Sequence, residues 1–121
     1  MREVSRNEYL ARLENKRGNR MVKVLTGIRR CGKSYLLFTL FRRRLRESGV
    51  DEEHIIALAL DSLANSRFLN RDELYNYVIA QMKDEKTYYV LLDEIQLVSG
   101  FEAVLNSLLH IENVDVYVTG S

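Results

Sequence analysis

Four short apolar runs alternate along the chain with longer segments in which apolar residues recur every three or four positions. The runs cover residues 21–26, 54–60, 88–92 and 114–119. Runs that are apolar almost throughout are typical of strands buried on both faces of a parallel sheet. The spaced apolar residues between them are typical of helices that cover such a sheet. The pattern therefore predicts a three-layer α/β fold with a parallel sheet and right-handed crossovers.

Helix boundaries can also be predicted from the sequence. A leading helix at about residues 6–17 begins with a capping-box spacing at Ser5 and ends at Gly18. A longer helix is expected over residues 33–48, and Gly49 ends it. These signals place one helix before the first strand and one directly after it.

Two further helices are expected in the second half of the chain. Asn70 precedes one of them as a predicted N-cap, and its apolar stripe reaches Met82 before a polar turn at residues 83–86. Ser99 is the predicted cap of the other, whose stripe starts at Phe101. Every strand after the first is therefore preceded by a helical crossover.

The composition fits one globular domain, but basic and acidic residues are distributed unevenly along the chain. The chain has 121 residues, 46% of them hydrophobic. Residues 1–50 hold 14 Lys and Arg against 4 Asp and Glu, whereas residues 51–121 hold 4 against 13. A basic half of this kind indicates either a nucleic-acid face or a phosphate site, and both need positive potential.

The sequence argues against a membrane protein and against a zinc site. No apolar run approaches the roughly 18 residues that a membrane helix needs, and the first residues lack a signal peptide's apolar stretch, so we expect a cytoplasmic protein. Cys31 is the only cysteine and cannot form an internal disulfide. His54 and His110 lie far from it and from each other, show no partners, and are interpreted as surface or packing residues.

A glycine-rich motif lies between the first strand and its helix. Residues 27–34 read Gly-Ile-Arg-Arg-Cys-Gly-Lys-Ser, two glycines with four residues between them, followed by lysine and serine. In this position backbone N–H groups and the helix dipole face phosphate oxygens, and glycine lets the backbone approach closely. A plain strand-to-helix turn explains the glycines but not the lysine and serine. The motif therefore predicts a phosphate-binding loop.

Each residue of this loop has an expected role. We expect Lys33 to reach the β- and γ-phosphates of a bound nucleotide, and the Ser34 hydroxyl to bind the Mg²⁺ ion that bridges them. The side chains of the two arginines contact phosphate, face a partner or reach solvent, and the cysteine is a small filler rather than a nucleophile. The predicted nucleotide-binding positions are Gly27, Arg29, Arg30, Cys31, Gly32, Lys33, Ser34 and Tyr35.

An acidic pair follows the third strand. Asp93 and Glu94 come directly after the apolar run 88–92, and ligands of doubly wound sheets bind at the carboxyl ends of the strands. We predict that Asp93 binds Mg²⁺, directly or through water, and that Glu94 activates the water that attacks the γ-phosphate. Glu94 and Lys33 are thus the predicted catalytic groups. Acidic pairs after a strand also occur as solvated loop residues or helix caps.

Two further segments of the sequence carry polar or charged side chains. Thr119 and Ser121 follow the fourth strand, where a hydroxyl either contacts the γ-phosphate or the attacking water, or belongs to an ordinary turn. Residues 42–46 form a basic run on the third and fourth turns of the helix after the phosphate loop, and we interpret it as a solvated face.

With these motifs in view, the chain resembles the prokaryotic AAA-type ATP-binding proteins. Their phosphate loop reads Thr-Gly-Ile-Arg-Arg-Cys-Gly-Lys-Ser and their acidic motif Leu-Asp-Glu-Ile-Gln, which residues 26–34 and 92–96 match. The likeness spans the whole chain, and the terminal Val-Thr-Gly-Ser is similar to the sensor-1 strand of such ATPases. The resemblance implies a P-loop NTPase fold with strand order 1-4-3-2, because in that family the sensor strand lies between the strands that carry the two motifs.

The resemblance also concerns what such proteins contain beyond these motifs. Members of the family are much longer, with a fifth strand, a helical lid and a further C-terminal domain. We therefore expect residues 1–121 to be a truncated AAA-type nucleotide-binding domain with its core at 20–121, and a weak or inactive ATPase by itself, because such sites usually need an added arginine. Without a fifth strand, residues 21–26 become an exposed sheet edge, which predicts self-association.

The expected function is Mg²⁺-dependent ATP hydrolysis that rearranges a partner domain. The alternative is a nucleotide-sensing switch or scaffold that binds ATP with negligible turnover and regulates a DNA- or toxin-related partner. A small-molecule kinase would need a substrate pocket and a lid, and a helicase would need further motifs, none of which the sequence contains.

Overall fold

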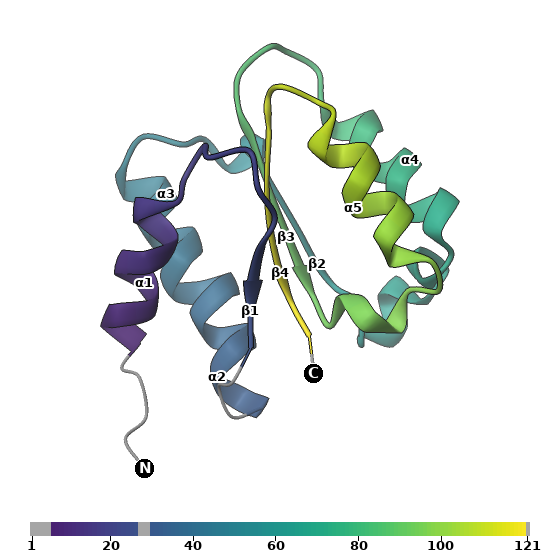
Figure 1. The fold of residues 1–121 in the computed structure, drawn as a ribbon, viewed down its shortest axis with the longest axis horizontal. Coiled ribbons are helices and arrows are strands. Elements are labelled where there is room, and N and C mark those ends of the chain that lie inside the picture. Colours follow the sequence, from purple (N-terminus) through teal and green to yellow (C-terminus); the bar gives the residue numbers. More distant parts are fainter. Residues whose placement is uncertain (1–5, 27–29, 121) are drawn as a thin grey trace.

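The computed structural model describes residues 6–26 and 30–120. Its strands are β1 (Lys23–Leu25), β2 (Ile55–Ala59), β3 (Tyr88–Asp93) and β4 (Val114–Thr119). Its α-helices are α1 (Arg6–Asn15), α2 (Arg30–Tyr35), α3 (Arg42–Glu47), α4 (Arg71–Gln81) and α5 (Phe101–Leu109). In Figure 1, α1, α2 and α3 cover one face of the sheet, and α4 and α5 cover the other. This is the predicted three-layer arrangement.

The four strands form one parallel sheet in the order β1-β4-β3-β2. Leu25 pairs with Thr119 where β1 and β4 end, and Ala59 pairs with Asp93 where β2 and β3 end. The strand order confirms the prediction. Because all strands run in the same direction, their carboxyl ends meet at one edge of the sheet, at the bottom of Figure 1.

Side chains of the central strands alternate between the two faces, as the period of two in a strand requires. In β3, Tyr89 and Leu91 belong to the core under α1 to α3, whereas Val90 and Leu92 belong to the core under α4 and α5. Every residue of β3 is buried. The next position, Asp93, has the parity of Tyr89 and Leu91, so its side chain lies on the α2 side of the sheet.

The helix after the glycine-rich loop differs from the prediction in two ways. It begins at Arg30, three residues before the predicted start, and its middle is a π-helical segment, Leu36–Phe41, between α2 and α3. Within that segment Leu36, Leu37 and Phe41 are all buried in the same core. The wider π turn, with its bond between residues five apart, brings these positions onto one face.

The two predicted caps in the second half of the chain have different outcomes. The Asn70 side chain accepts hydrogen bonds from the N–H groups of Asp72 (2.9 Å) and Glu73 (3.1 Å), which confirms it as the N-cap of α4. The capping role given to Ser99 is wrong, because Gly100 is the N-cap of α5, with φ of 75°. Glycine adopts this left-handed conformation without the strain that a Cβ would cause.

Strand β1 is shorter than predicted and joins the rest of the sheet through a buried ion pair. Lys23 pairs with Asp115 of β4, and both side chains are almost fully buried. Asp115 also accepts hydrogen bonds from the Tyr117 hydroxyl (2.7 Å) and the Gly18 N–H (2.9 Å). This network fixes the turn between α1 and β1, and so the strand that leads into the glycine-rich loop.

The leading helix and the outer side of β1 can be compared directly with their predictions. The leading helix ends at Asn15, two residues before the expected boundary, and its predicted cap Ser5 lies outside the described residues. Strand β1 pairs with β4 and, in the described part of the chain, with no second strand. Beside this strand edge, Met21 and Val24 are 64% and 57% exposed.

Among the described helices, none is long and apolar enough to span a membrane.

Candidate functional site

The two predicted motifs meet at the carboxyl edge of the sheet. Ser34 lies in the helix that follows the glycine-rich loop, and Asp93 is the last residue of β3. The Ser34 hydroxyl donates a 2.5 Å hydrogen bond to Asp93 Oδ2. The structure therefore brings together the hydroxyl and the carboxylate predicted to bind Mg²⁺, although 59 residues separate them in the sequence.

Thr119 completes this contact from the end of β4. It is fully buried, and its hydroxyl donates a short hydrogen bond to Asp93 Oδ1. The Thr119 hydroxyl oxygen in turn accepts a hydrogen bond of 2.9 Å from the Glu94 N–H. Asp93 is only 2% exposed, so its two oxygens are satisfied by two hydroxyls rather than by bulk water. Thr119 thus fixes both members of the acidic pair.

Lys33 points to the same edge of the sheet. Its side chain is 6% exposed, and its Nζ donates a 2.7 Å hydrogen bond to the carbonyl oxygen of Gly120. An ammonium group held by a neutral carbonyl keeps its positive charge available for an anion. A phosphate oxygen at this position would replace a weaker partner with a fully charged one.

Glu94 has an unusual backbone conformation. Its φ of 59° and ψ of 51° place it in the left-handed region, which costs a residue with a Cβ roughly 1 to 2 kcal/mol. Its carboxylate oxygen Oε1 accepts a 2.8 Å hydrogen bond from Gln96 Nε2. Strain of this kind at the end of a strand is often retained because it directs a side chain toward a ligand. The sequence motif does not predict this contact, because it does not show which way the Gln96 side chain turns.

The remaining predicted nucleotide-binding residues are only partly covered by the structure. Gly27 and Arg29 lie outside the described residues, as does Ser121. The backbone of Arg30 and Cys31 forms the start of α2, and their side chains lie outside what the structure describes. In the same helix, Gly32 is buried and Tyr35 is 43% exposed.

The groups at this edge fit a nucleotide with a magnesium ion. Mg²⁺ prefers hard oxygen ligands, commonly one or two carboxylates and a hydroxyl together with phosphate oxygens. Ser34 and Asp93 supply this donor set, and Lys33 supplies positive charge beside it. Neither cysteine nor histidine contributes to this group of three described residues, so the donor chemistry suits magnesium better than zinc.

His54 does not behave as predicted, because it has partners. It is 3% exposed, its Nε2–H donates a 2.8 Å hydrogen bond to Asp84, and its Nδ1 lies 4.0 Å from Asp51. This hydrogen bond is the main reason why the pKa of Asp84 lies below its usual value. The prediction that His54 has no partners is therefore wrong, because the fold brings the loop before β3 to the start of β2. Its interpretation as a packing residue agrees with the structure, since the ring is buried and packs against Tyr88.

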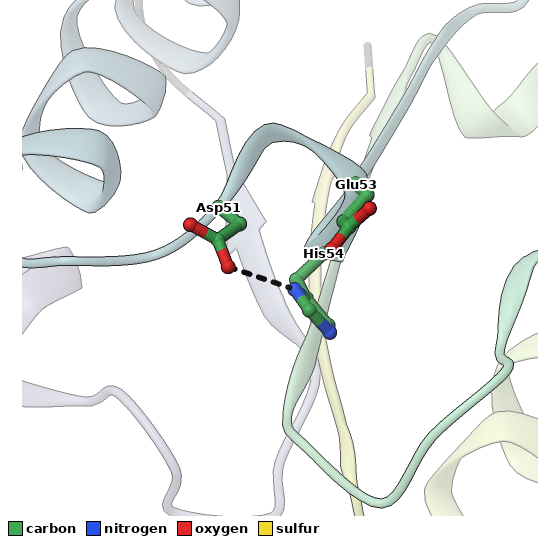
Figure 2. Close-up of side chains that lie close together, drawn as sticks. All are labelled: Asp51, Glu53 and His54. Carbon is green, nitrogen blue, oxygen red and sulfur yellow. Dashed lines mark ion pairs between the residues drawn. The ribbon is translucent and has the colours of Figure 1, made fainter.

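Figure 2 shows the Asp51 carboxylate facing the His54 ring, with Glu53 beside them. Ligand atoms of these three residues lie within 4.8 Å of one another, which is close enough for a metal. Asp51 and Glu53 are exposed, however, and His54 already has a carboxylate partner in Asp84. We interpret the group as a polar anchor at the amino end of β2, the opposite edge of the sheet from Asp93.

The basic run at residues 42–46 lies on α3 and forms ion pairs. Arg44 contacts Glu14 of α1 at 2.7 Å, and Arg46 contacts Glu52 at 2.8 Å. These arginines are partly exposed, and such surface pairs contribute little to stability. The run is therefore the charged outer surface of the helix, in which Arg42 and Arg46 share Glu52 as a partner and Arg44 pairs with Glu14.

Comparison with known proteins yields one family and two curated relatives. The sequence profile of the AAA domain matches residues 19–121. An uncharacterized protein of Haemophilus influenzae is 32% identical over 119 residues, covering 98% of this chain and 30% of the relative. An uncharacterized protein of Methanocaldococcus jannaschii is 28% identical over 104 residues, covering 83% of this chain and 21% of the relative. No solved structure matches significantly. The chain thus spans less than a third of either relative.

Proposed function

Because this chain belongs to the AAA domain family, we propose that it binds ATP with Mg²⁺ at the carboxyl edge of its sheet, and that the full-length protein hydrolyses this ATP. The observation that carries the proposal is the hydrogen bond between Ser34 and Asp93, with Lys33 at the same edge. A hydroxyl and an ammonium group from the helix after the glycine-rich loop, with a carboxylate from the end of β3, are the groups that phosphate and magnesium require.

Binding is assigned to the residues around α2. Lys33 would exchange the Gly120 carbonyl for the β- and γ-phosphate oxygens, and Ser34 and Asp93 would hold Mg²⁺. The bound ion would neutralise charge on the phosphates. Gly27, Arg29, Arg30, Cys31, Gly32 and Tyr35 complete the proposed nucleotide contacts.

Hydrolysis is assigned to Glu94. Its carboxylate accepts a proton from a water molecule as the water oxygen attacks the γ-phosphorus, and the bond to the ADP oxygen breaks. The Thr119 hydroxyl holds the Glu94 backbone N–H and contacts Asp93, so it keeps base and metal ligand in a fixed relation. Energy from this step would rearrange another domain of the longer protein.

Isothermal titration calorimetry with ATP and Mg²⁺ tests the binding step. We expect Lys33→Ala to weaken binding on the order of a hundredfold, since it removes a charge-assisted contact. Lys86→Ala, which removes an exposed lysine far from this edge, is the matched control and should bind like the parent. Equal affinity of Lys33→Ala and the parent would show that the phosphate site has been assigned to the wrong residues.

Single-turnover hydrolysis in the full-length protein separates an ATPase from a nucleotide-sensing switch. An ATPase should form ADP at a rate that Glu94→Gln lowers on the order of a hundredfold or more. A switch or scaffold that regulates a DNA- or toxin-related partner should bind ATP and release it unchanged in both proteins. The second result would exclude hydrolysis while leaving ATP binding intact.

A further inference from the structure

We propose that Gln96 is a positioning residue that fixes the direction of the Glu94 carboxylate during ATP hydrolysis. The inference rests on the proposed function and adds a residue to it. Its basis is the 2.8 Å hydrogen bond from Gln96 Nε2 to Glu94 Oε1.

The turn that carries Gln96 is held firmly although the glutamine itself is exposed. It is a single 3₁₀ turn, Ile95–Leu97, that starts directly after Glu94. Ile95 and Val98 on either side are 4% and 1% exposed and belong to the core under α4 and α5. The Val98 N–H also bonds the Ile95 carbonyl at 3.0 Å. The backbone of Gln96 is therefore fixed by buried neighbours, and its amide is presented from a rigid support.

Glu94 is held at both ends by this arrangement. Its backbone N–H is bound to Thr119, and its carboxylate is bound to Gln96. A free glutamate side chain samples many rotamers and loses much entropy when it is ordered. The two hydrogen bonds meet that cost before the substrate arrives, which is the condition for efficient general-base catalysis.

The other end of the Gln96 amide lies against Gly120. A Cβ built at Gly120 would lie 3.3 Å from Gln96 Oε1, and the carbonyl of Gly120 accepts the hydrogen bond from Lys33. The glutamine amide thus lies between the proposed base and the residue that contacts the proposed phosphate-binding lysine. From this position, the Gln96 side chain can keep the Glu94 carboxylate at the edge of the sheet where the γ-phosphate would bind.

The simpler interpretation is that the bond is an exposed surface contact without consequence. Such contacts contribute little to stability, so a stability measurement would not distinguish the two interpretations. A misplaced general base is different, because a shift of about 1 Å can cost on the order of a hundredfold in rate. The test must therefore measure turnover and substrate binding separately.

The experiment uses the full-length protein with Gln96→Ala and Gln96→Met, of which the second keeps the side-chain length but cannot donate a hydrogen bond. We expect kcat to fall on the order of tenfold in both variants, with KM and the Kd for ATP and Mg²⁺ within about twofold of the parent. Gln81→Ala, an exposed glutamine at the end of α4, is the matched control and should leave kcat unchanged.

A double-mutant cycle tests whether Gln96 acts through Glu94. In a Glu94→Gln background, adding Gln96→Ala should slow hydrolysis no further. The inference is overturned if Gln96→Ala and Gln96→Met turn over like the parent, if their effect falls on KM or Kd alone, or if the effects of the two positions simply add. If parent and Glu94→Gln hydrolyse ATP equally, the proposed function itself fails and this inference fails with it.

Discussion

Ser34 Oγ lies 2.5 Å from Asp93 Oδ2, so the helix after the glycine-rich loop and the end of β3 are joined by a direct hydrogen bond. The contact follows from strand parity, because Asp93 shares the α2 face of the sheet with Tyr89 and Leu91. A one-residue shift in β3 would turn the carboxylate to the opposite face.

Removal of the Ser34 hydroxyl should weaken magnesium-dependent ATP binding. Ser34→Ala deletes one of the proposed oxygen ligands and leaves the Asp93 carboxylate with Thr119 as its remaining hydroxyl partner, so we expect the affinity for ATP in the presence of Mg²⁺ to fall on the order of tenfold or more. Ser34→Thr keeps the hydroxyl and is the control. Calorimetry with and without Mg²⁺ measures the effect, and a variant that loses no magnesium dependence would contradict the assignment.

Thr119 is expected to matter for stability as well as for turnover. Thr119→Val has nearly the same shape but leaves Asp93 Oδ1 and the Glu94 N–H without their partner at a buried position. We expect a loss of about 1 to 3 kcal/mol in the free energy of unfolding. Chemical denaturation measures it, and Thr119→Ser, which restores the hydroxyl, should recover most of the difference.

Breaking the buried pair of Lys23 and Asp115 should lower the free energy of unfolding more than Thr119→Val does. Asp115→Ala would leave a buried ammonium group unpaired, together with the Tyr117 hydroxyl and the Gly18 N–H. We expect the free energy of unfolding to drop by about 3 to 5 kcal/mol. The double variant Lys23→Met with Asp115→Leu removes both charges and should recover the part of the loss that comes from the unpaired ammonium group, while the Tyr117 hydroxyl and the Gly18 N–H stay without their acceptor. If the single variant is as stable as the double, the ion pair does not hold β1.

Tyr117 should limit stability at alkaline pH. Burial, and then its hydrogen bond to Asp115, raise the pKa of this phenol far above the ordinary value of 10.0. In the unfolded chain the same group ionises near pH 10, so its contribution to stability is complete below that pH and is lost as the pH rises beyond it. Tyr117→Phe should flatten the alkaline limb of a plot of unfolding free energy against pH. Tyr35→Phe, at an exposed position, should leave that limb unchanged.

The free side of β1 predicts self-association of the isolated chain. In the described residues β1 pairs with β4 alone, and the exposed Met21 and Val24 side chains add apolar surface beside it. Light scattering should show dimers or larger species as concentration rises. Val24→Lys places a charge beside the edge and should shift the protein toward monomer. A parent protein that stays monomeric at high concentration would rule out edge pairing.

Much of the fold could be predicted from local patterns. The apolar run of β3 is buried at every position, and the Asn70 cap forms as its sequence indicates. The strand order came from the resemblance, since a pattern of apolar residues does not specify which strands are neighbours. The failures were also local, as with Ser99, where the conformational freedom of Gly100 outweighed the capping preference of serine.

The contacts that local patterns did not reveal join residues far apart in the sequence. Lys23 and Asp115 are separated by 92 residues, and each looks like an ordinary strand-end charge until the register of β1 and β4 is known. His54 and Asp84 meet for the same reason. The meeting of Ser34 and Asp93 could be anticipated, because carboxyl ends of parallel strands share one edge of the sheet.

The left-handed backbone at Glu94 has an evolutionary consequence. Glycine tolerates this conformation, so Glu94→Gly would relieve about 1 kcal/mol of strain while removing the carboxylate. A screen for heat resistance alone would favour that change, whereas a screen for ATP hydrolysis would reject it if Glu94 is the general base proposed above. Selection for thermal stability and selection for hydrolysis would therefore favour different residues at this position.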